Sequence, residues 1–314
     1  MNISGEELWQ WRRWAIAAIP PWLEPRQAQI ELDWLLQAVA DLDTLSLRLA
    51  SYRGLAQIPI KLSLRELTGL WHRRWQDRIP LQYLVGEVPW RNLKLHVSPA
   101  VLIPRPETEE LIDLAIEAVN YHPELSPPHP SSPHWADLGT GSGAIALGLA
   151  YSFPTAKIHA VDRSAAALEM AGRNRDRQDW GKDGGAGTLQ DRLHFYQGDW
   201  LEPLAKLKGH LTGIVSNPPY IPTELLDELE REVVEHEPSL ALDGGADGLT
   251  AIREIIETAA DYLQPGGVLL LEMMSGQDQQ VRQLLEQTGR YREIQIHRDL
   301  SGVPRFAQAF KQVS

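Results

Sequence analysis

The chain is 314 residues long, which exceeds what a single hydrophobic core usually serves, so two domains are expected. Hydrophobic residues make up 43% of the chain and charged residues 23%, a balance that excludes general disorder. The formal net charge of -12 disfavours a binder of duplex DNA, and the absence of cysteine excludes a disulfide scaffold, a cysteine nucleophile and an iron–sulfur cluster.

Neither a membrane nor a metal ion is predicted as a partner. No run of about 18 apolar residues is available to cross a bilayer. The acidic pair Glu6 and Glu7 near the N-terminus is unlike the basic flank of a secretory signal. The ten histidines are scattered along the chain. The sequence therefore predicts a cytoplasmic protein without a metal site.

The first part of the chain, residues 1–80, is predicted to be a small helical bundle. Capping-box patterns at Ser4–Glu7 and Ser63–Glu66 each begin a helix, and a further helix is expected over residues 26–40. Residues 1–90 carry ten basic and ten acidic side chains, and eight of the 11 tryptophans fall there. A neutral, tryptophan-rich domain suits a protein contact, although most of these rings are expected to fill the bundle's own core.

Residues 81–105 are predicted to form a β-hairpin connection, because two alternating stretches flank Pro89–Asn92. From residue 106 onward a helix to about Asn120 is followed by strands that alternate with helices, which predicts an α/β fold with a largely parallel sheet. Strands are expected at 135–138, 158–161, 194–196, 214–216, 268–272, 292–297 and 305–310, and the last two should pair antiparallel. Helices are expected near 143–152, 164–175, 223–235, 248–263 and 277–288, and the segments 122–133 and 181–187 are predicted loops.

The turn Asp137-Leu138-Gly139-Thr140-Gly141-Ser142-Gly143 follows the first strand of this sheet. Its glycines allow a sharp turn that exposes backbone N–H groups to a ligand across the strand ends. Asp162 stands at the tip of the next strand, 21 residues after Gly141, where a carboxylate can accept hydrogen bonds from two ribose hydroxyls. A nicotinamide dinucleotide also fits this spacing, so the glycines alone leave the ligand open.

The segment Asn217-Pro218-Pro219-Tyr220 follows the fourth strand. Two prolines fix two φ angles and hold Asn217 towards extended geometry. The loop therefore presents two acceptors, the side-chain oxygen of Asn217 and the carbonyl of Pro218, next to the aromatic face of Tyr220. This array suits a planar NH₂ group whose two hydrogens are held.

These motifs together resemble the protein-(glutamine-N5) methyltransferases that modify peptide-chain release factors. The likeness covers nearly the whole chain. It rests on five segments: Pro80–Leu84, Leu102-Ile103-Pro104-Arg105-Pro106-Glu107-Thr108-Glu109, Asp137–Gly143, Asn217–Tyr220 and Leu240–Gly248. The resemblance implies a seven-stranded class I (Rossmann-like) domain over residues 106–314, S-adenosylmethionine as the cofactor, and the glutamine of a Gly-Gly-Gln loop as the substrate.

Carried over to this chain, the resemblance implies catalytic roles for Asn217, Pro218 and Tyr220, which with Pro219 would hold the substrate glutamine. It implies cofactor contacts for Gly139, Thr140, Gly141, Ser142, Gly143, Asp162, Trp200 and Asn217, with Trp200 packed on the adenine; a buried core position is the alternative for this ring. Asn-Pro-Pro-Tyr also occurs in adenine-N6 methyltransferases of nucleic acids, the competing interpretation, which the acidic charge disfavours. A non-enzymatic cofactor-binding protein is a further alternative. A monomer that acts on release factors, with no direct nucleic-acid partner, is expected.

Overall fold

The structure, a computed structural model, describes residues 1–21, 23–40, 42–121, 133–178 and 188–313. The described residues form two compact units, Met1–Glu87 with Arg231–His236, and Val88–Glu230 with Glu237–Ser314. The predicted loop at 181–187 lies outside the described residues, as does the loop at 122–133 apart from its last residue, and so does Trp22. The assignment of separate roles to residues 1–80, 81–105 and 106–314 stays a prediction.

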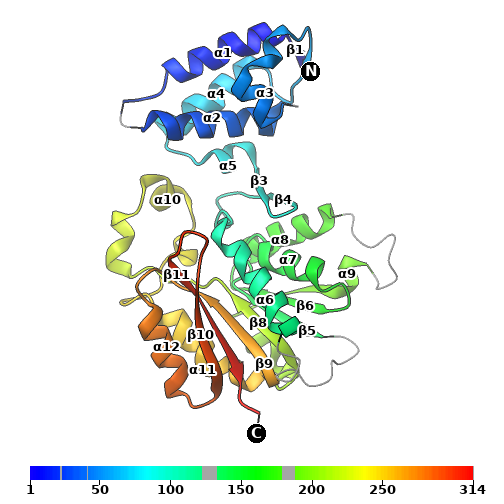
Figure 1. Cartoon of the computed structure of the whole chain (residues 1–314), viewed down its shortest axis with the longest axis vertical. Coiled ribbons are helices and arrows are strands. Elements are labelled where there is room, and N and C mark those ends of the chain that lie inside the picture. The colour runs from blue at the N-terminus through cyan, green and yellow to red at the C-terminus, as the bar shows by residue number, and fades with distance from the viewer. Residues whose placement is uncertain (22, 41, 122–132, 179–187, 314) are drawn as a thin grey trace. The chain divides into compact units, whose positions relative to one another are not determined.

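The first unit is mainly helical, as its capping boxes and apolar spacing predict (Figure 1). Its elements are α1 (Gly5–Ala17), α2 (Pro25–Val39), α3 (Thr44–Leu49), α4 (Leu64–Gln76), α5 (Leu81–Val85) and α10 (Arg231–His236), with β1 (Asn2–Ile3) antiparallel to β2 (Ile58–Pro59). Both capping boxes are confirmed, since Ser4 and Glu7 cap α1 reciprocally and Ser63 and Glu66 do the same for α4. The sequence did not predict α3, α5, β1 or β2, which are too short to give a periodic signal.

Tryptophans and one buried ion-pair cluster hold the first unit together. Trp11 and Trp71 lie in its core, and Trp71 donates its ring N–H to the carbonyl of Ala15 at 3.0 Å. Arg74 is buried and contacts the carboxylates of Glu31 and Glu232 at 2.7 and 2.9 Å. These rings therefore fill the core, the alternative that the sequence left open for most of them.

The second unit contains a seven-stranded sheet and a two-stranded sheet of β3 (Glu87–Trp90) and β4 (Leu93–His96). The large sheet has the order β10-β11-β9-β8-β5-β6-β7. Its strands are β5 (His134–Leu138), β6 (Lys157–Asp162), β7 (Leu193–Gln197), β8 (Leu211–Ser216), β9 (Leu263–Glu272), β10 (Tyr291–Arg298) and β11 (Pro304–Lys311). β5–β9 pair parallel, while β11 is antiparallel to both β9 and β10, which confirms the predicted α/β class and the final antiparallel pair.

Helices lie on both sides of this sheet (Figure 1). They are α6 (Glu110–Tyr121), α7 (Ala144–Ser152), α8 (Ala165–Arg177), α9 (Leu189–Arg192), α11 (Thr250–Tyr262) and α12 (Asp278–Gln287). The single helix predicted over 223–235 is wrong: a 3₁₀ helix, Thr223–Glu228, ends at extended Leu229 before α10 begins. This stretch is strongly acidic, and like charges four residues apart, such as Glu224 and Glu228, weaken a continuous α-helix.

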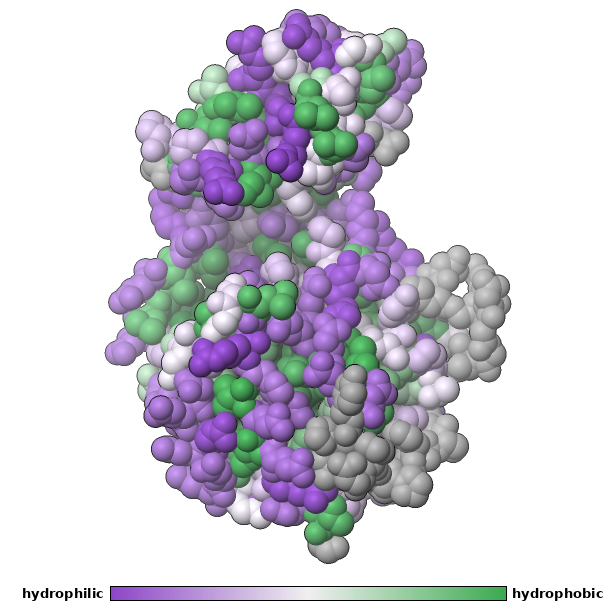
Figure 2. Space-filling view, viewed as in Figure 1, coloured by the Kyte–Doolittle hydropathy of each residue, from purple (hydrophilic) through white to green (hydrophobic). Residues whose placement is uncertain are grey.

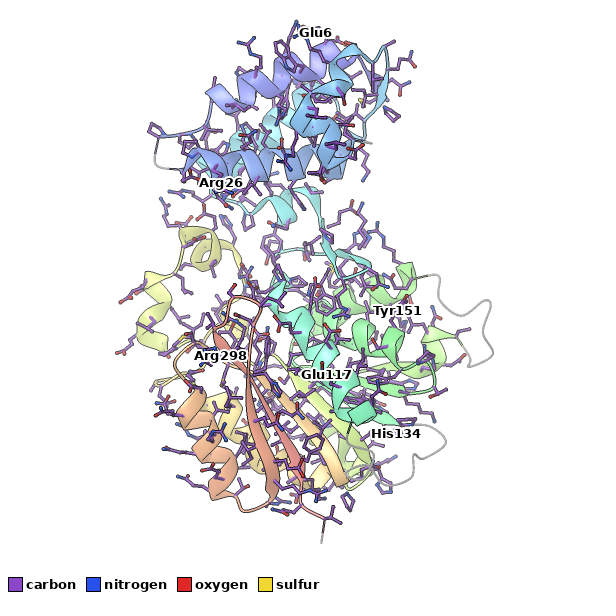
Figure 3. The ribbon with its side chains drawn as sticks, in the orientation of Figure 1. Glu6, Arg26, Glu117, His134, Tyr151 and Arg298 are labelled. Carbon is purple, nitrogen blue, oxygen red and sulfur yellow. The ribbon has the colours of Figure 1, made fainter. Side chains whose placement is uncertain are left out.

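The outer surface is mostly polar. Figure 2 shows hydrophilic residues over most of the visible face, with hydrophobic ones scattered among them. Charged side chains also close loops, since Arg298, labelled in Figure 3 near the β10–β11 connection, donates to the carbonyl of Gly302 at 2.6 Å. None of the described helices is both long enough and apolar enough to span a bilayer.

Candidate active site

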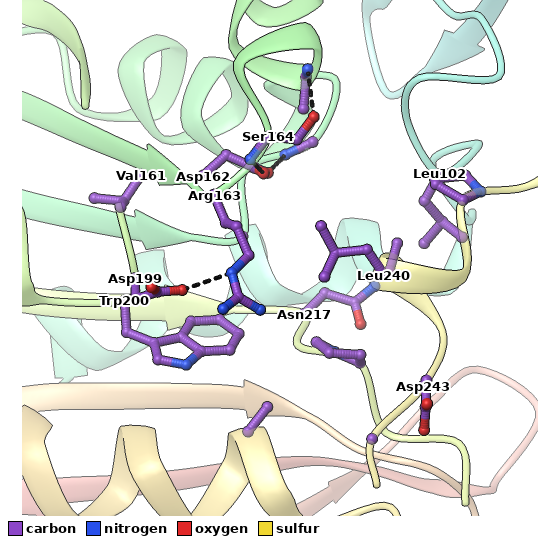
Figure 4. A pocket seen from close by; sticks show the side chains of 18 of the residues that line it. Leu102, Val161, Asp162, Arg163, Ser164, Asp199, Trp200, Asn217, Leu240 and Asp243 are labelled. Carbon is purple, nitrogen blue, oxygen red and sulfur yellow. Dashed lines mark hydrogen bonds and ion pairs between the residues drawn. The ribbon is translucent and has the colours of Figure 1, made fainter. Parts of the chain in front are cut away.

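The sheet order brings four predicted motifs to one edge. β5 lies between β6 and β8, so the loops after these strands leave in opposite directions and open a crevice at their carboxyl ends. A cavity of about 380 Å³ occupies this position. Figure 4 shows Asp162, Trp200 and Asn217 around it, which come from the ends of β6, β7 and β8.

The glycine turn after β5 takes a conformation that its residues make possible. Gly139, Gly141 and Gly143 all have positive φ, at 72°, 54° and 82°. A Cβ on Gly143 would lie 3.1 Å from the Cβ of Ala171, so this glycine permits α8 to approach closely. Gly139 and Gly141 line the cavity.

Two buried aspartates organise the strand ends. Asp162 accepts the backbone N–H groups of Gly141 and Ser164, each at 2.8 Å, while burial raises its pKa above the usual range. Asp137 is fully buried and accepts the Thr140 hydroxyl at 2.6 Å and the Ala146 N–H at 2.9 Å. Burial raises the pKa of Asp137 to about 7. Asp162 lines the cavity, whereas Asp137 acts from beneath it by shaping the turn.

The loop after β7 supplies an aromatic wall. Trp200 has a φ of 43° and donates its ring N–H to Glu254 at 3.1 Å. Arg163 forms an ion pair with Asp199 at 2.8 Å, and both side chains line the cavity beside the indole (Figure 4). The wall therefore combines a flat apolar face with charged groups.

The loop after β8 carries the diproline corner. Asn217 donates its side-chain N–H to the hydroxyl oxygen of Thr108 at 3.2 Å, and the Thr108 hydroxyl donates to Glu272 at 2.7 Å. Tyr220 donates its hydroxyl to the other oxygen of Glu272 at 3.1 Å. Burial, followed by the nearby Glu272 carboxylate, raises the pKa of Tyr220 well above its usual range.

The segment from Leu240 to Gly248 braces this corner. Ile221 donates its backbone N–H to the carbonyl of Leu242 at 3.0 Å, and Gly244 donates to the carbonyl of Ile221 at 2.8 Å. A Cβ on Gly248 would lie 2.3 Å from the carbonyl oxygen of Tyr220, so only glycine permits this approach. Asn217 and Pro219 are thereby held at the cavity wall.

The structure brings together some of the predicted site residues and not others. Gly139, Gly141, Asp162, Trp200, Asn217 and Pro219 line the cavity. Five others do not line it and lie behind or beside it: Thr140, Ser142, Gly143, Pro218 and Tyr220. Sequence reasoning gave no role to Arg163, Glu254, Thr108 or Glu272, because their contacts join segments far apart in the chain. Thr108 had a signal, its place in the Leu102–Glu109 segment.

The arrangement suits a ligand with a ribose and a flat ring. The Asp162 carboxylate is an acceptor for hydroxyls, and Trp200 offers a face for stacking. Asn217, on the wall beyond them, can accept from a second, polar ligand. Within the described residues, no three histidine, aspartate or glutamate side chains are grouped so as to hold a metal ion.

Comparisons with known proteins agree with this geometry. The family model for the methyltransferase small domain matches residues 124–245. A release factor glutamine methyltransferase of Thermosynechococcus vestitus is 48% identical, with 98% of this chain and 99% of that protein covered. One from Synechocystis sp. is 46% identical, with 98% and 97% covered. The hMettl16 catalytic domain, solved with MAT2A 3'UTR hairpin 6, shares the fold at 11% identity, with a TM-score of 0.55 and 89% of each chain covered.

Proposed function

The chain belongs to the release factor glutamine methyltransferase family, and from this premise we propose that it methylates the glutamine of the Gly-Gly-Gln loop in peptide-chain release factors. In this reaction the bond from sulfur to the methyl carbon of S-adenosylmethionine breaks, a bond from that carbon to the side-chain amide nitrogen, N5, forms, and the nitrogen loses one proton to water. The fold is that of a class I, Rossmann-like methyltransferase domain joined to a helical unit. The observation that carries the proposal is the position of Asn217 and Pro219 at the wall of a cavity that the Asp162 carboxylate and the Trp200 indole also line.

The cavity residues fit S-adenosylmethionine. Gly139 and Gly141 present no side chain to the cavity, and at their positive φ angles of 72° and 54° a residue with a Cβ would be strained. Asp162 would accept the ribose hydroxyls and Trp200 would pack on the adenine. The turn Gly139–Gly143, with Thr140 and Ser142, would enclose the remainder. When bound, this cofactor supplies a methyl group activated by a positively charged sulfonium.

The residues of the corner orient the nucleophile. A carboxamide nitrogen is a poor nucleophile, because its lone pair is delocalised into the carbonyl, so positioning and exclusion of water are the protein's main contributions. The Asn217 side-chain oxygen and the Pro218 carbonyl would accept the two N–H bonds of the substrate amide. Pro219 fixes the backbone, and Tyr220, which does not line the cavity, anchors the corner through its hydrogen bond to Glu272. Both acceptors also stabilise positive charge that develops on the nitrogen.

The same acceptors give specificity. A glutamate side chain would bring like charge and no donors to the corner, so it is repelled. Sites built on buried hydrogen bonds discriminate by roughly 10⁴–10⁵ against analogues that lack them. An adenine amino group shares the planar NH₂, so an adenine-N6 methyltransferase is the outcome that competes in the test below.

The test is methyl transfer from radiolabelled S-adenosylmethionine to a release factor, DNA and RNA, side by side. We expect label on the release factor alone, and mass spectrometry should find one added methyl on one glutamine. Label on nucleic acid, or none on the release factor, contradicts the proposal. Asn217→Ala should keep its cofactor dissociation constant while transfer falls by about 10²-fold or more. Unchanged transfer would remove Asn217 from the mechanism.

The helical unit is proposed to recognise the protein substrate, and the enzyme to act as a cytoplasmic monomer. Support comes from the neutral charge of residues 1–90 and from the partly exposed ring of Trp14, at 38% exposure. The test compares Trp14→Ala with wild type on the intact release factor and on a short Gly-Gly-Gln peptide. A higher KM for the intact factor alone supports the recognition role, and equal KM changes for both substrates count against it.

A further inference from the structure

Two polar side chains lie directly behind the diproline corner without lining the cavity. Thr108, in the 3₁₀ turn Glu107–Glu109, is 4% exposed, and Glu272, the last residue of β9, is 1% exposed. Both belong to the same compact unit as Asn217. Burying a hydroxyl and a carboxylate is costly unless each finds a partner, so their arrangement needs a reason.

The hydrogen bonds between them have a defined direction. A threonine hydroxyl has one hydrogen, and the Thr108 hydrogen points to Glu272 at 2.7 Å. Above its pKa of about 7 the Glu272 carboxylate is ionised and only accepts, so the Thr108 oxygen keeps only lone pairs for its other neighbour, Asn217, at 3.2 Å. Tyr220 occupies the second oxygen of Glu272 at 3.1 Å, which fixes the carboxylate in turn.

This direction decides which end of the Asn217 amide faces Thr108. Only the nitrogen can donate to the Thr108 lone pairs. If the amide were flipped, its oxygen would face the Thr108 oxygen, and neither of these acceptors would receive a hydrogen from the other. The amide oxygen of Asn217 is therefore left for the other side of the side chain, where the cavity lies.

We propose that Thr108 and Glu272 are positioning residues that hold the Asn217 amide with its oxygen towards the substrate. This inference rests on the proposed function and adds to it the origin of the preference for an amide. A flipped Asn217 would present NH₂ to the substrate, which suits a carboxylate or carbonyl and repels a glutamine NH₂. The two residues thus select the substrate through Asn217 without touching it.

A purely structural role for Thr108 makes different predictions. As a brace between the 3₁₀ turn and β9, it would affect stability, cofactor binding and catalysis together. As a positioning residue, it affects kcat while cofactor affinity stays nearly constant. The chain also offers a matched control: Thr212 in β8 is 2% exposed, and its hydroxyl has no hydrogen-bond partner among the described residues.

The experiment measures kcat and KM with a full-length release factor, cofactor affinity by calorimetry, and thermal stability. Thr108→Val should lower kcat by about 10²-fold, with the cofactor dissociation constant and the KM for the release factor each within about threefold of wild type. Thr108→Ser restores the hydroxyl and should return kcat to within about threefold of wild type. Thr212→Val should leave kcat, the KM for the release factor and the cofactor dissociation constant unchanged.

A second measurement does not depend on methyl transfer, and its deciding readout is made on the wild-type protein. The side-chain NH₂ of Asn217 in the wild-type protein, identified by its loss from the Asn217→Ala amide spectrum, should include one proton protected from exchange with water. Thr108→Val should abolish that protection. Exchange at the solvent rate in the wild type overturns the proposal.

The kinetic arm overturns the proposal in three ways. Thr108→Val could keep kcat within about threefold, Thr108→Ser could fall as far as Thr108→Val, or cofactor affinity could fall in parallel with kcat. A wild-type enzyme that leaves the release factor unmethylated refutes the proposed function, and the exchange measurement still decides the role of Thr108.

Discussion

Replacing Glu272 by glutamine tests whether a buried charge lowers the stability of the second unit. Burial raises the pKa of Glu272 from an ordinary value of 4.5 to about 7; Glu107 raises it further, whereas the Thr108 and Tyr220 hydroxyls and Arg305 oppose the shift. Between these two pKa values the folded chain keeps a proton that the unfolded chain has lost. Stability is therefore greatest at low pH and falls as pH rises through this window.

The size of this effect follows from the two pKa values. Integrating proton binding from about pH 5 to about pH 8.5 gives a loss of about 2 to 3 kcal/mol for the wild type, which Glu272→Gln should not show. For a domain of this size, that corresponds to roughly 5 to 10 °C in melting temperature. We therefore expect the difference in stability between Glu272→Gln and wild type to change by this amount, in favour of Glu272→Gln, as the pH rises from about 5 to about 8.5.

The assay is differential scanning calorimetry of both proteins without cofactor at each pH. Other titrating groups, Asp137 among them, are present in both proteins and cancel in the comparison. Glu169→Gln, which replaces an exposed carboxylate on α8, is the control, and it should change the melting temperature by the same amount at both pH values. If Glu272→Gln and wild type lose the same stability between the two pH values, the carboxylate does not titrate as the burial argument requires.

Three further predictions concern the turn, the ribose site and a buried ring. Asp162→Ala should weaken S-adenosylmethionine binding by about 10- to 100-fold in calorimetry, and an unaltered dissociation constant refutes the ribose assignment. Gly143→Ala should destabilise the protein by about 1–3 kcal/mol in thermal melts, and by more than Gly209→Ala. Gly209 has a similar φ of 75°, but a Cβ there would have no neighbour within 4 Å, whereas a Cβ on Gly143 would lie 3.1 Å from the Cβ of Ala171. Equal losses of stability in the two variants would contradict this reasoning. Burial lowers the pKa of His159 from 6.5 to about 3, so below about pH 6.5 the unfolded chain binds a proton that the folded chain does not, and stability falls as pH drops. His159→Phe should reduce this loss of stability in thermal melts between about pH 7 and about pH 5. An unchanged dependence of stability on pH would exclude His159 as its source.

Much of the fold could be predicted because its signals are local. All seven strands of the large sheet were predicted, since each is a short apolar or alternating segment bounded by turns. Ser4 and Ser63 revealed two helix starts through side chains three residues away. The 3₁₀ turn and break within 223–235 were not predicted, because helical periodicity does not register repulsion among acidic side chains.

The candidate site was predictable only in part, for a related reason. Glycines permit a positive φ and prolines fix φ, so the turn after β5 and the corner after β8 could be predicted directly from the sequence. Thr108 contacts Asn217 across 109 positions and Glu272 across 164 positions. Such a contact depends on the order of strands in the sheet, which the alternation of elements leaves undetermined.

Glu272 also shows why a costly carboxylate can be the appropriate residue behind this corner. A glutamine there has one oxygen and one NH₂ group, so its amide can turn either end towards Thr108. With NH₂ facing Thr108, that hydroxyl is free to donate to Asn217 and would favour the flipped amide. Above its pKa of about 7, the ionised Glu272 carboxylate presents an acceptor on both sides and allows a single direction. The stability given up by burying the charge therefore secures the orientation of Asn217, an exchange that is common where binding groups must be held in place.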